Sequence, residues 1–212
     1  MTGRRARSAT GARDTSYLER PLGQFLDLVA SKEPAPGGGA VAAVTVALAA
    51  GLVGMAARFS EGRLPESERL AEAADNLRRR AAMLAEEDAE AYRAVLAALA
   101  LPREPDPESR RARVREALQQ AAEVPLCIAV IGAEVAERAA RLADEGNPNL
   151  RGDTVTAALV AEAAVRSAAE LVRVNVEMGK LDEDLLRAAD RHVRAAAEAA
   201  RRAGAVGREA EP

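Results

Sequence analysis

Apolar residues recur at helical spacing along most of this chain, and almost no segment alternates apolar and polar residues as a strand does. Leu18, Leu22, Phe25 and Val29, for example, fall on one face of a helix. The same pattern predicts helices over residues 18–31, 37–60, 65–101, 107–145, 153–176 and 182–202. Long helices joined by short connections are typical of antiparallel bundles. We therefore expect an all-α protein, an antiparallel bundle of about six long helices.

Residues 37–57 stand out because they contain no charged side chain. A run of about 18 or more apolar residues raises the alternative of a membrane span. Here eight positions are Ala and five are Gly, and few residues favour insertion into a bilayer. We expect instead a central helix that is buried on all sides, and no association with a membrane.

Proline, glycine and asparagine mark the limits of the later helices. Asp106 and Pro107 suit the N-cap and the first position of a helix. Pro125 lies inside the same periodic stretch, so we expect a kink or break near Val124. The segment 146–149, Gly-Asn-Pro-Asn, indicates a turn, after which Asp153 is placed to cap the next helix.

Length and composition suit one domain of 212 residues, which we place at residues 16–202. Residues 1–15 read as a disordered basic tail, with a transit peptide as the alternative, and residues 203–212 as a frayed tail. A net charge of −3 gives no general attraction to nucleic acid. The single Cys127 excludes an internal disulfide and indicates a reducing, cytoplasmic setting. With one His192 and one thiol, we expect no metal site of the usual zinc kind.

A carboxylate interrupts the apolar stripe of the third predicted helix. Leu84, Asp88 and Tyr92 follow one another at a spacing of four residues, so Asp88 occupies a position that the pattern assigns to the core. Burial of an unpaired carboxylate is costly, and Asp88 therefore has either a structural partner, such as an Arg or a backbone group, or a role in a site. Tyr92 is either an ordinary core residue or a ligand contact.

Two loops are candidate binding segments. Residues 36–39, Pro-Gly-Gly-Gly, lead into the uncharged helix and can present backbone N–H groups to a carboxylate or carbonyl; a simple turn is the alternative. No Walker sequence or dinucleotide motif is present there, so we expect no nucleotide. The second loop offers the side chains of Asn147, Asn149 and Arg151, although Asn is also a plain turn former. Asp153 is either a helix cap or a site residue.

Four motifs, in order, resemble those of a known family. They are residues 25–43, residues 88–92 with the Leu101-Pro102 that follows, residues 121–126, and residues 146–149 with Asp153. They are similar to motifs of the cyclodeaminase/cyclohydrolase family, which comprises the C-terminal domain of formiminotransferase-cyclodeaminase and stand-alone methenyltetrahydrofolate cyclohydrolases. The resemblance covers roughly residues 18 to 195. This chain departs from the family pattern at residues 46–49, which hold less glycine, and at Leu171, where a polar side chain is usual.

The resemblance implies a helical bundle, a homodimer with its folate site near the subunit contact, and one-carbon chemistry on a tetrahydrofolate derivative without metal or nucleotide. A cyclohydrolase adds water to the methenyl carbon of a cationic ring. A cyclodeaminase closes N10 on a formimino carbon and releases ammonia, and a formiminotransferase is then an expected partner. Asp88 is the first candidate for proton transfer or for stabilising the cation, and Asp153 is the second.

The remaining candidates are assigned to substrate binding. Residues 36–39 (Pro36, Gly37, Gly38 and Gly39), together with Asn147 and Asn149, are expected to hold the pterin. Arg151 or Arg173 is expected to meet the glutamate tail, with Tyr92 and Asn175 as further contacts. The alternative function is a non-catalytic folate-binding or helical interaction module with the same fold.

Overall fold

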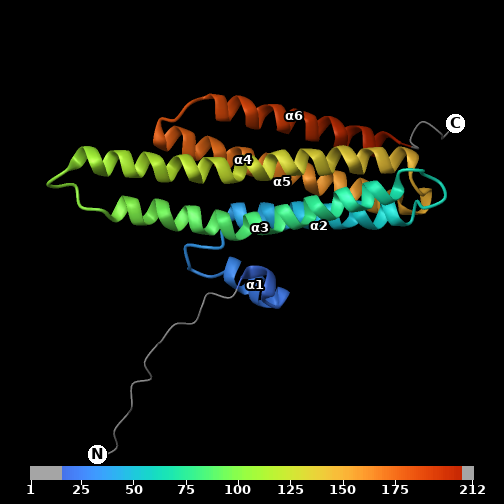
Figure 1. The fold of residues 1–212 in the computed structure, drawn as a ribbon, viewed down its shortest axis with the longest axis horizontal. Coiled ribbons are helices and arrows are strands. Elements are labelled where there is room, and N and C mark those ends of the chain that lie inside the picture. Colours follow the sequence, from blue (N-terminus) through green and yellow to red (C-terminus); the bar gives the residue numbers. More distant parts are fainter. Residues whose placement is uncertain (1–15, 207–212) are drawn as a thin grey trace, which may run out of the picture.

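The structure, a computed structural model, describes residues 16–206. Within this range the chain forms six α-helices and no strand, which confirms the predicted all-α fold (Figure 1). Helices α2 to α6 form an elongated antiparallel bundle, and the short helix α1 lies beside it. The elements are η1 Tyr17–Glu19, α1 Leu22–Val29, α2 Gly38–Arg58, α3 Ser67–Ala100, α4 Pro107–Glu145, η2 Pro148–Leu150, α5 Arg151–Gly179 and α6 Asp184–Ala205, where η marks a 3-10 turn.

The two predicted tails fall mostly outside this range. The basic tail at residues 1–15 lies outside the described residues, and of the segment 203–212 only residues 203–206 are described. Helix α6 continues past residue 202 to Ala205, because Ala203 is fully buried in the core. The last turn of α6 is therefore part of the packed domain.

Alanine dominates the buried core, and this brings the helix axes close together. The contact between α4 and α5 is especially tight at Gly132, where an added Cβ would lie 2.5 Å from Cγ2 of Val165. Larger side chains are fully buried at only a few points, such as Leu118 and Ile128. The fold thus depends on close packing of many small side chains.

The sequence predicts a kink or a break near Val124. Helix α4 runs unbroken through Pro125, so the expectation of a break is wrong. Proline removes one backbone hydrogen bond from a helix interior. Here α4 packs against α2, α3, α5 and α6, and Pro125 itself is buried. This packing on all sides maintains the helix despite the lost bond.

Helix α2 lies at the edge of the bundle, which corrects the expectation of a central helix buried on all sides. It packs against α3, α4 and α5 but leaves one apolar face exposed, with Val41 at 37% and Leu48 at 66% exposure. The central place belongs to α4, which contacts the other four bundle helices. By length and composition α2 and α4 are apolar enough to cross a membrane, yet 56% of each apolar window is buried in the bundle, as in the core helices of soluble proteins.

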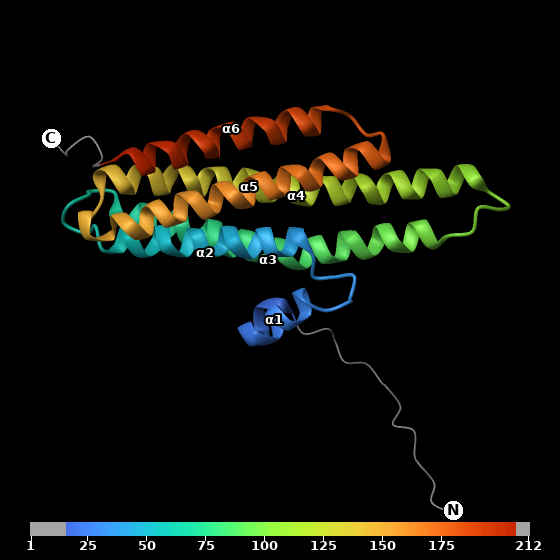
Figure 2. The same ribbon diagram turned by 180° about the vertical axis from the view of Figure 1, so that it is seen from behind.

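The bundle helices differ in how far they extend. Helices α3 and α5 continue past the N-terminus of α2, as Figure 2 shows. The chain between α1 and α2, residues 30–37, approaches this point as a loop. A recess of about 300 Å³ lies where α2 begins, and residues of α3, α5 and this loop line it.

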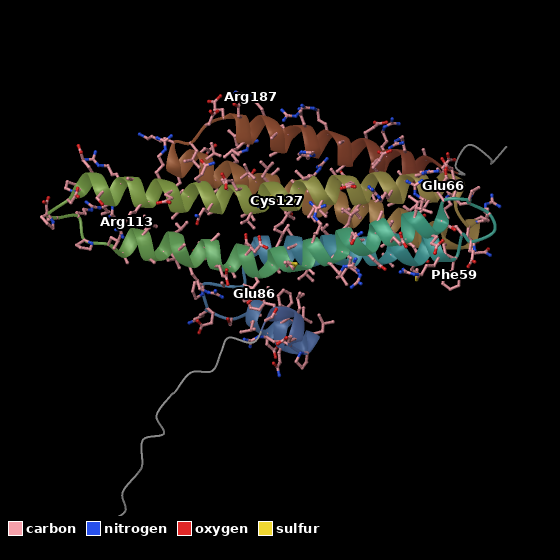
Figure 3. All side chains as sticks on the ribbon, in the orientation of Figure 1. Phe59, Glu66, Glu86, Arg113, Cys127 and Arg187 are labelled. Atoms are coloured by element: carbon pink, nitrogen blue, oxygen red, sulfur yellow. The ribbon has the colours of Figure 1, made fainter. Side chains whose placement is uncertain are left out.

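Contacts with α3 hold the segment that precedes this loop. Glu86 accepts hydrogen bonds from the hydroxyl of Ser16 at 3.1 Å and from the backbone N–H of Tyr17 at 3.0 Å. The ring of Tyr17 packs edge-on against Phe25 of α1, with ring centres 5.9 Å apart. Figure 3 shows Glu86 on the side of α3 that faces α1. These contacts hold the segment that precedes α2 against the middle of α3.

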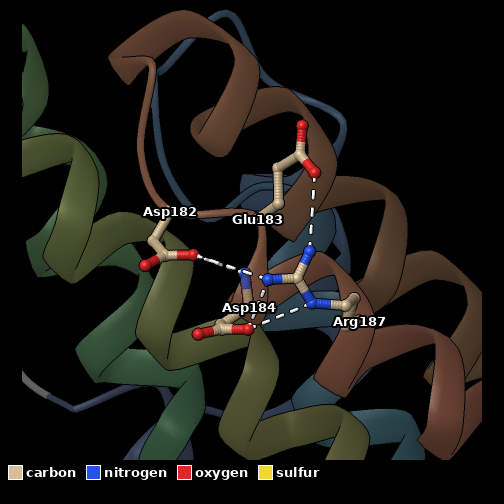
Figure 4. A network of polar contacts seen from close by, with 4 residues as sticks. All are labelled: Asp182, Glu183, Asp184 and Arg187. Atoms are coloured by element: carbon tan, nitrogen blue, oxygen red, sulfur yellow. Dashed lines mark hydrogen bonds and ion pairs between the residues drawn. The ribbon is translucent and has the colours of Figure 1, made fainter.

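At the C-terminal end of α5, the chain turns into α6 through Lys180, which adopts the left-handed conformation with φ of 48°. Arg187 then joins the carboxylates that begin α6: it lies 2.5 Å from Asp184, 3.5 Å from Glu183 and 3.9 Å from Asp182 (Figure 4). All four side chains are exposed, so this network adds little to stability.

Candidate active site

The carboxyl group of Asp88 lies against the N-terminus of α2. Its Oδ2 atom accepts a hydrogen bond from the backbone N–H of Ala40 at 3.1 Å. A Cβ added to Gly39 would overlap Oδ1 of Asp88, far below the 3.0 Å that real contacts respect. Only glycine at position 39 allows the carboxylate so close to a helix N-terminus, where the free N–H groups favour negative charge.

A cavity of about 300 Å³ opens in front of this carboxyl group. It lies where α2 begins, and its wall combines the loop before α2 with α3, α4 and α5. Most of the lining is apolar or backbone, with a few polar side chains, as is usual for small-molecule sites. The lining residues are Pro34, Ala35, Gly37, Gly38, Gly39, Asp88, Tyr92, Ala121, Leu171, Val174 and Asn175.

Burial raises the pKa of Asp88 above the ordinary aspartate value of 3.8, and the hydrogen bond from Ala40 lowers it by a smaller amount. Loss of hydration disfavours the charged form of a carboxylate, whereas a donated hydrogen bond favours it. Asp88 therefore exchanges its proton at a higher pH than an exposed aspartate. This property suits a group that accepts and returns a proton during a reaction.

Asn175 of α5 supplies a second polar group with a fixed orientation. Its Nδ2 atom donates to the carbonyl of Ala121 at 2.7 Å and to the carbonyl of Leu171 at 2.9 Å. Carbonyl groups only accept hydrogen bonds, so the amide nitrogen must face them and Oδ1 must point the other way. The described part of the chain supplies no donor to Oδ1, and Asn175 lines the cavity. The cavity thus holds a fixed hydrogen-bond acceptor.

The structure brings together one group of the predicted site residues. Asp88, Tyr92, Asn175 and the glycines at 37–39 all line the cavity, and Pro36 is buried in the loop beside them. Tyr92 is 45% exposed, which excludes the alternative of an ordinary core tyrosine. No arginine pairs with Asp88 among the described residues; its partner is the Ala40 backbone. The predicted glycine loop and the predicted carboxylate are therefore parts of one site.

A second group lies at the opposite end of α2. Asn147 does not line the cavity. Its backbone N–H donates to Ser60 Oγ and its side-chain amide donates to the carbonyl of Phe59, both at 2.9 Å. Figure 3 shows Phe59 at one end of the bundle, away from Glu86, which precedes Asp88 by two residues in α3. Because α2 has 21 residues, this end is about 30 Å from the cavity within one chain.

Asn149, Arg151 and Asp153 share this distant location, since they follow Asn147 directly. Asp153 lies inside the first turn of α5, which begins at Arg151, so the prediction that Asp153 caps this helix is wrong. The 3-10 turn at residues 148–150 extends the helical path further back than the turn signal indicates. One chain does not place these residues beside Asp88.

Arg173 lies on α5 but does not line the cavity. Its guanidinium group is 3.5 Å from Asp190 of α6 and 3.6 Å from Glu170. The apolar wall residues Leu171 and Val174 are not identified by the sequence pattern alone. Leu171 lies three residues before Val174 and four before Asn175, and this spacing places Leu171 next to both along the helix surface.

The described residues contain no group of three or more His, Cys, Asp and Glu side chains placed to hold a metal ion. The polar side chains that line the cavity supply a carboxyl group with a raised pKa, a phenol and a fixed amide oxygen.

Known proteins share both sequence and fold with this chain. The family model described as formiminotransferase-cyclodeaminase matches residues 21–195. Methenyltetrahydrofolate cyclohydrolase of Methylorubrum extorquens is 38% identical over 161 residues, which cover 72% of this chain and 77% of that protein. Formimidoyltransferase-cyclodeaminase of Sus scrofa is 33% identical over 172 residues, covering 77% of this chain but 32% of the longer protein.

The fold is similar to that of a solved structure. The crystal structure of formiminotetrahydrofolate cyclodeaminase from Thermotoga maritima matches with a TM-score of 0.78 and 29% identity, covering 88% of this chain and 94% of the other. The matched segment of the family contains every residue that lines the cavity. The chain belongs to the formiminotransferase-cyclodeaminase family.

Proposed function

We propose that this protein hydrolyses methenyltetrahydrofolate to formyltetrahydrofolate, with Asp88 as the group that moves the proton. Support comes from the similarity to a methenyltetrahydrofolate cyclohydrolase, which covers 72% of this chain and 77% of that protein. The single observation that carries the proposal is the Asp88 carboxyl group, which has a raised pKa and faces a cavity at the N-terminus of α2. A reduced pterin carries several N–H donors, for which the Asn175 oxygen is a suitable acceptor.

The reaction needs water and one proton-transfer group. The water oxygen attacks the cationic methenyl carbon while the Asp88 carboxylate takes a proton from the water. Collapse of the adduct breaks the bond from this carbon to a ring nitrogen, which receives the proton back from Asp88. The hydroxyl proton of the adduct leaves to solvent as the formyl carbonyl forms. One water is consumed and one proton is released, and the carboxylate also stabilises the substrate cation before attack.

A second candidate reaction is the cyclodeaminase reaction. The raised pKa of Asp88 favours it, because a protonated carboxyl group can deliver the proton that departing ammonia requires. The similarity to the Thermotoga maritima cyclodeaminase is consistent with this reaction. The chain spans about a third of the formimidoyltransferase-cyclodeaminases that it matches. A separate formiminotransferase would then supply the substrate as a partner.

We propose further that the protein is a homodimer whose copies meet along α2. The outer face of this helix carries no charge before Arg58, and Leu48, at its midpoint, is 66% exposed. A two-fold axis near Leu48 pairs identical surfaces and sets the start of one α2 beside the end of the other. The Asn147–Asp153 segment of one subunit would then approach the cavity of its partner. This arrangement reunites the two groups of site residues that a single chain separates.

Turnover assays separate the candidate functions. Purified protein is mixed with methenyltetrahydrofolate, and loss of its near-ultraviolet absorbance is followed; ammonia release from formiminotetrahydrofolate is measured in parallel. We expect Asp88→Asn to lower kcat by about 100-fold or more with the helical circular dichroism unchanged. Binding of both folates without turnover by the wild type would favour the non-catalytic module, and loss of stability at full activity would transfer the proton role to Asp153.

Mixing of variant subunits tests the shared site. Asp88→Asn and Asp153→Asn each inactivate the homodimer if both groups serve one site. Random exchange of these subunits then makes half of the dimers mixed, with one intact site each, so about a quarter of wild-type activity returns. A site built from one chain alone gives no recovery, because every site keeps a substitution. Activity of Asp153→Asn by itself would remove Asp153 from the proposal.

A further inference from the structure

Pro125 is buried in the interior of α4, one turn after Ala121, which lines the cavity. Proline is the residue least suited to a helix interior, at a cost of about 3 kcal/mol relative to alanine. This buried proline nevertheless lies within a continuous helix of 39 residues. Local conflicts between sequence and structure of this kind concentrate at functional sites.

The missing N–H of Pro125 changes the hydrogen bonding of one particular carbonyl. In an α-helix the N–H of residue 125 would donate to the carbonyl of residue 121. Proline has no such hydrogen, so the carbonyl of Ala121 lacks its partner within α4. The amide of Asn175, from α5, donates to this carbonyl at 2.7 Å. A side chain from the neighbouring helix thus replaces the backbone donor that proline removes.

This replacement determines which way the Asn175 amide points. Its two N–H groups are used by the carbonyls of Ala121 and Leu171, and both Ala121 and Asn175 line the cavity. The oxygen is therefore held toward the ligand space. A freely rotating amide would offer donor and acceptor in turn, whereas this one offers only an acceptor.

We propose that Pro125 is a positioning residue of the folate site: by leaving the Ala121 carbonyl free, it fixes the Asn175 amide with its oxygen facing the cavity. The effect on folate rests on the function proposed above, whereas the positioning of the amide does not. Asn175 contacts the ligand, and Pro125 acts only through Asn175. The ligand group selected is a hydrogen-bond donor, such as a ring N–H or an amine.

Nuclear magnetic resonance tests the positioning without any ligand. The chain has four Asn and three Gln residues, so the side-chain amide region of a nitrogen-15 spectrum is sparse. Through-bond assignment identifies the Asn175 pair. In the wild type we expect both protons to exchange slowly with water, and in Pro125→Ala at least one to shift and exchange faster, since the new N–H competes for Ala121. An unchanged pair of signals overturns the proposal.

Binding of tetrahydrofolate, which carries no reacting one-carbon group, tests the consequence. Calorimetry of the full chain should show Pro125→Ala raising the Kd about three- to tenfold, the effect of weakening one hydrogen bond. Pro107→Ala is the matched control, because the first position of α4 needs no N–H; its Kd should equal that of the wild type. A purely structural role would change Tm and leave Kd unaltered.

A double-substitution cycle shows whether the effect passes through Asn175. In the Asn175→Ala background, Pro125→Ala should add no further loss of affinity. An equal loss in both backgrounds, or no loss in either, overturns the proposal. Where Asn175→Ala fails to fold, Asn175→Ser provides the second background. A wild type that binds no tetrahydrofolate contradicts the proposed function, and the amide spectra then decide the positioning on their own.

Discussion

Gly39→Ala is the sharpest perturbation of the site, because it adds one methyl group at the closest contact between α2 and α3. The new Cβ would overlap Oδ1 of Asp88, so either the carboxyl group or the start of α2 has to move. Its two neighbours offer matched controls. A Cβ on Gly38 would meet Leu171 at an ordinary 3.9 Å, and a Cβ on Gly37 would have no neighbour within 4 Å.

The expected cost follows from two terms. Forcing a methyl group into a packed contact costs about 1–3 kcal/mol. Displacement of the carboxyl group also breaks the 3.1 Å hydrogen bond from Ala40 to Asp88, and bonds to charged groups contribute about 1.5–3 kcal/mol. Partial relaxation keeps the sum near the lower end, at about 2 kcal/mol, which lowers Tm by about 4–8 °C in a chain of this size. A displacement of about 1 Å at a reacting group lowers turnover about 100-fold.

The assays are thermal unfolding followed by circular dichroism and the loss of methenyltetrahydrofolate absorbance. Gly37→Ala and Gly38→Ala should stay close to the wild type in Tm. In an Asp88→Ala background, Gly39→Ala should cost almost no stability, because the overlapping carboxyl group is gone. A Gly39→Ala protein with wild-type kcat, or with a Tm no lower than that of Gly37→Ala, would refute the assigned contact.

Four further outcomes are expected. For the wild type, kcat/KM for hydrolysis should fall as pH is lowered through the pKa of Asp88, which is raised above 3.8. Asp88→Asn should raise Tm at neutral pH. This gain in Tm shrinks toward pH 3.8, because the native carboxyl group then keeps its proton. Leu48→Glu should turn a dimer into a monomer by light scattering and abolish turnover, and a monomeric wild type at micromolar concentration would contradict the dimer. Gly132→Ala should lower stability by about 1–3 kcal/mol through contact with Val165, with kcat per folded molecule unchanged.

Periodicity predicts which face of a helix is buried but not which end of a bundle a loop occupies. Local spacing encodes the number and order of the helices, so both follow from the sequence. The same spacing identifies Asp88 as an exception in an apolar stripe. Asn147 and Asp153 belong to a turn that is equally compatible with either end of the bundle. Their separation from Asp88 by the length of α2 is a consequence of chain direction, which spacing alone does not reveal.

The sequence pattern also does not show which residues contact one another in the fold. The triple glycine indicates a close approach, yet only the structure shows that Gly39 alone touches Asp88 while Gly37 and Gly38 have room. Arg173 has the right charge for a glutamate tail, but its position on α5 brings it to Asp190 of α6. Tyr92 continues an apolar stripe and is nevertheless exposed at the cavity, because α2 begins too late to cover it.

The size of the recess depends on the residue at which α2 begins. A pocket carved by side chains changes its shape through substitution, one residue at a time. Here each residue added to the beginning of α2 would advance the helix about 1.5 Å into the space between α3 and α5, and each residue removed would enlarge that space. Insertions and deletions in the loop at residues 30–37 are therefore a route by which this architecture can accommodate larger or smaller ligands without any change in its core.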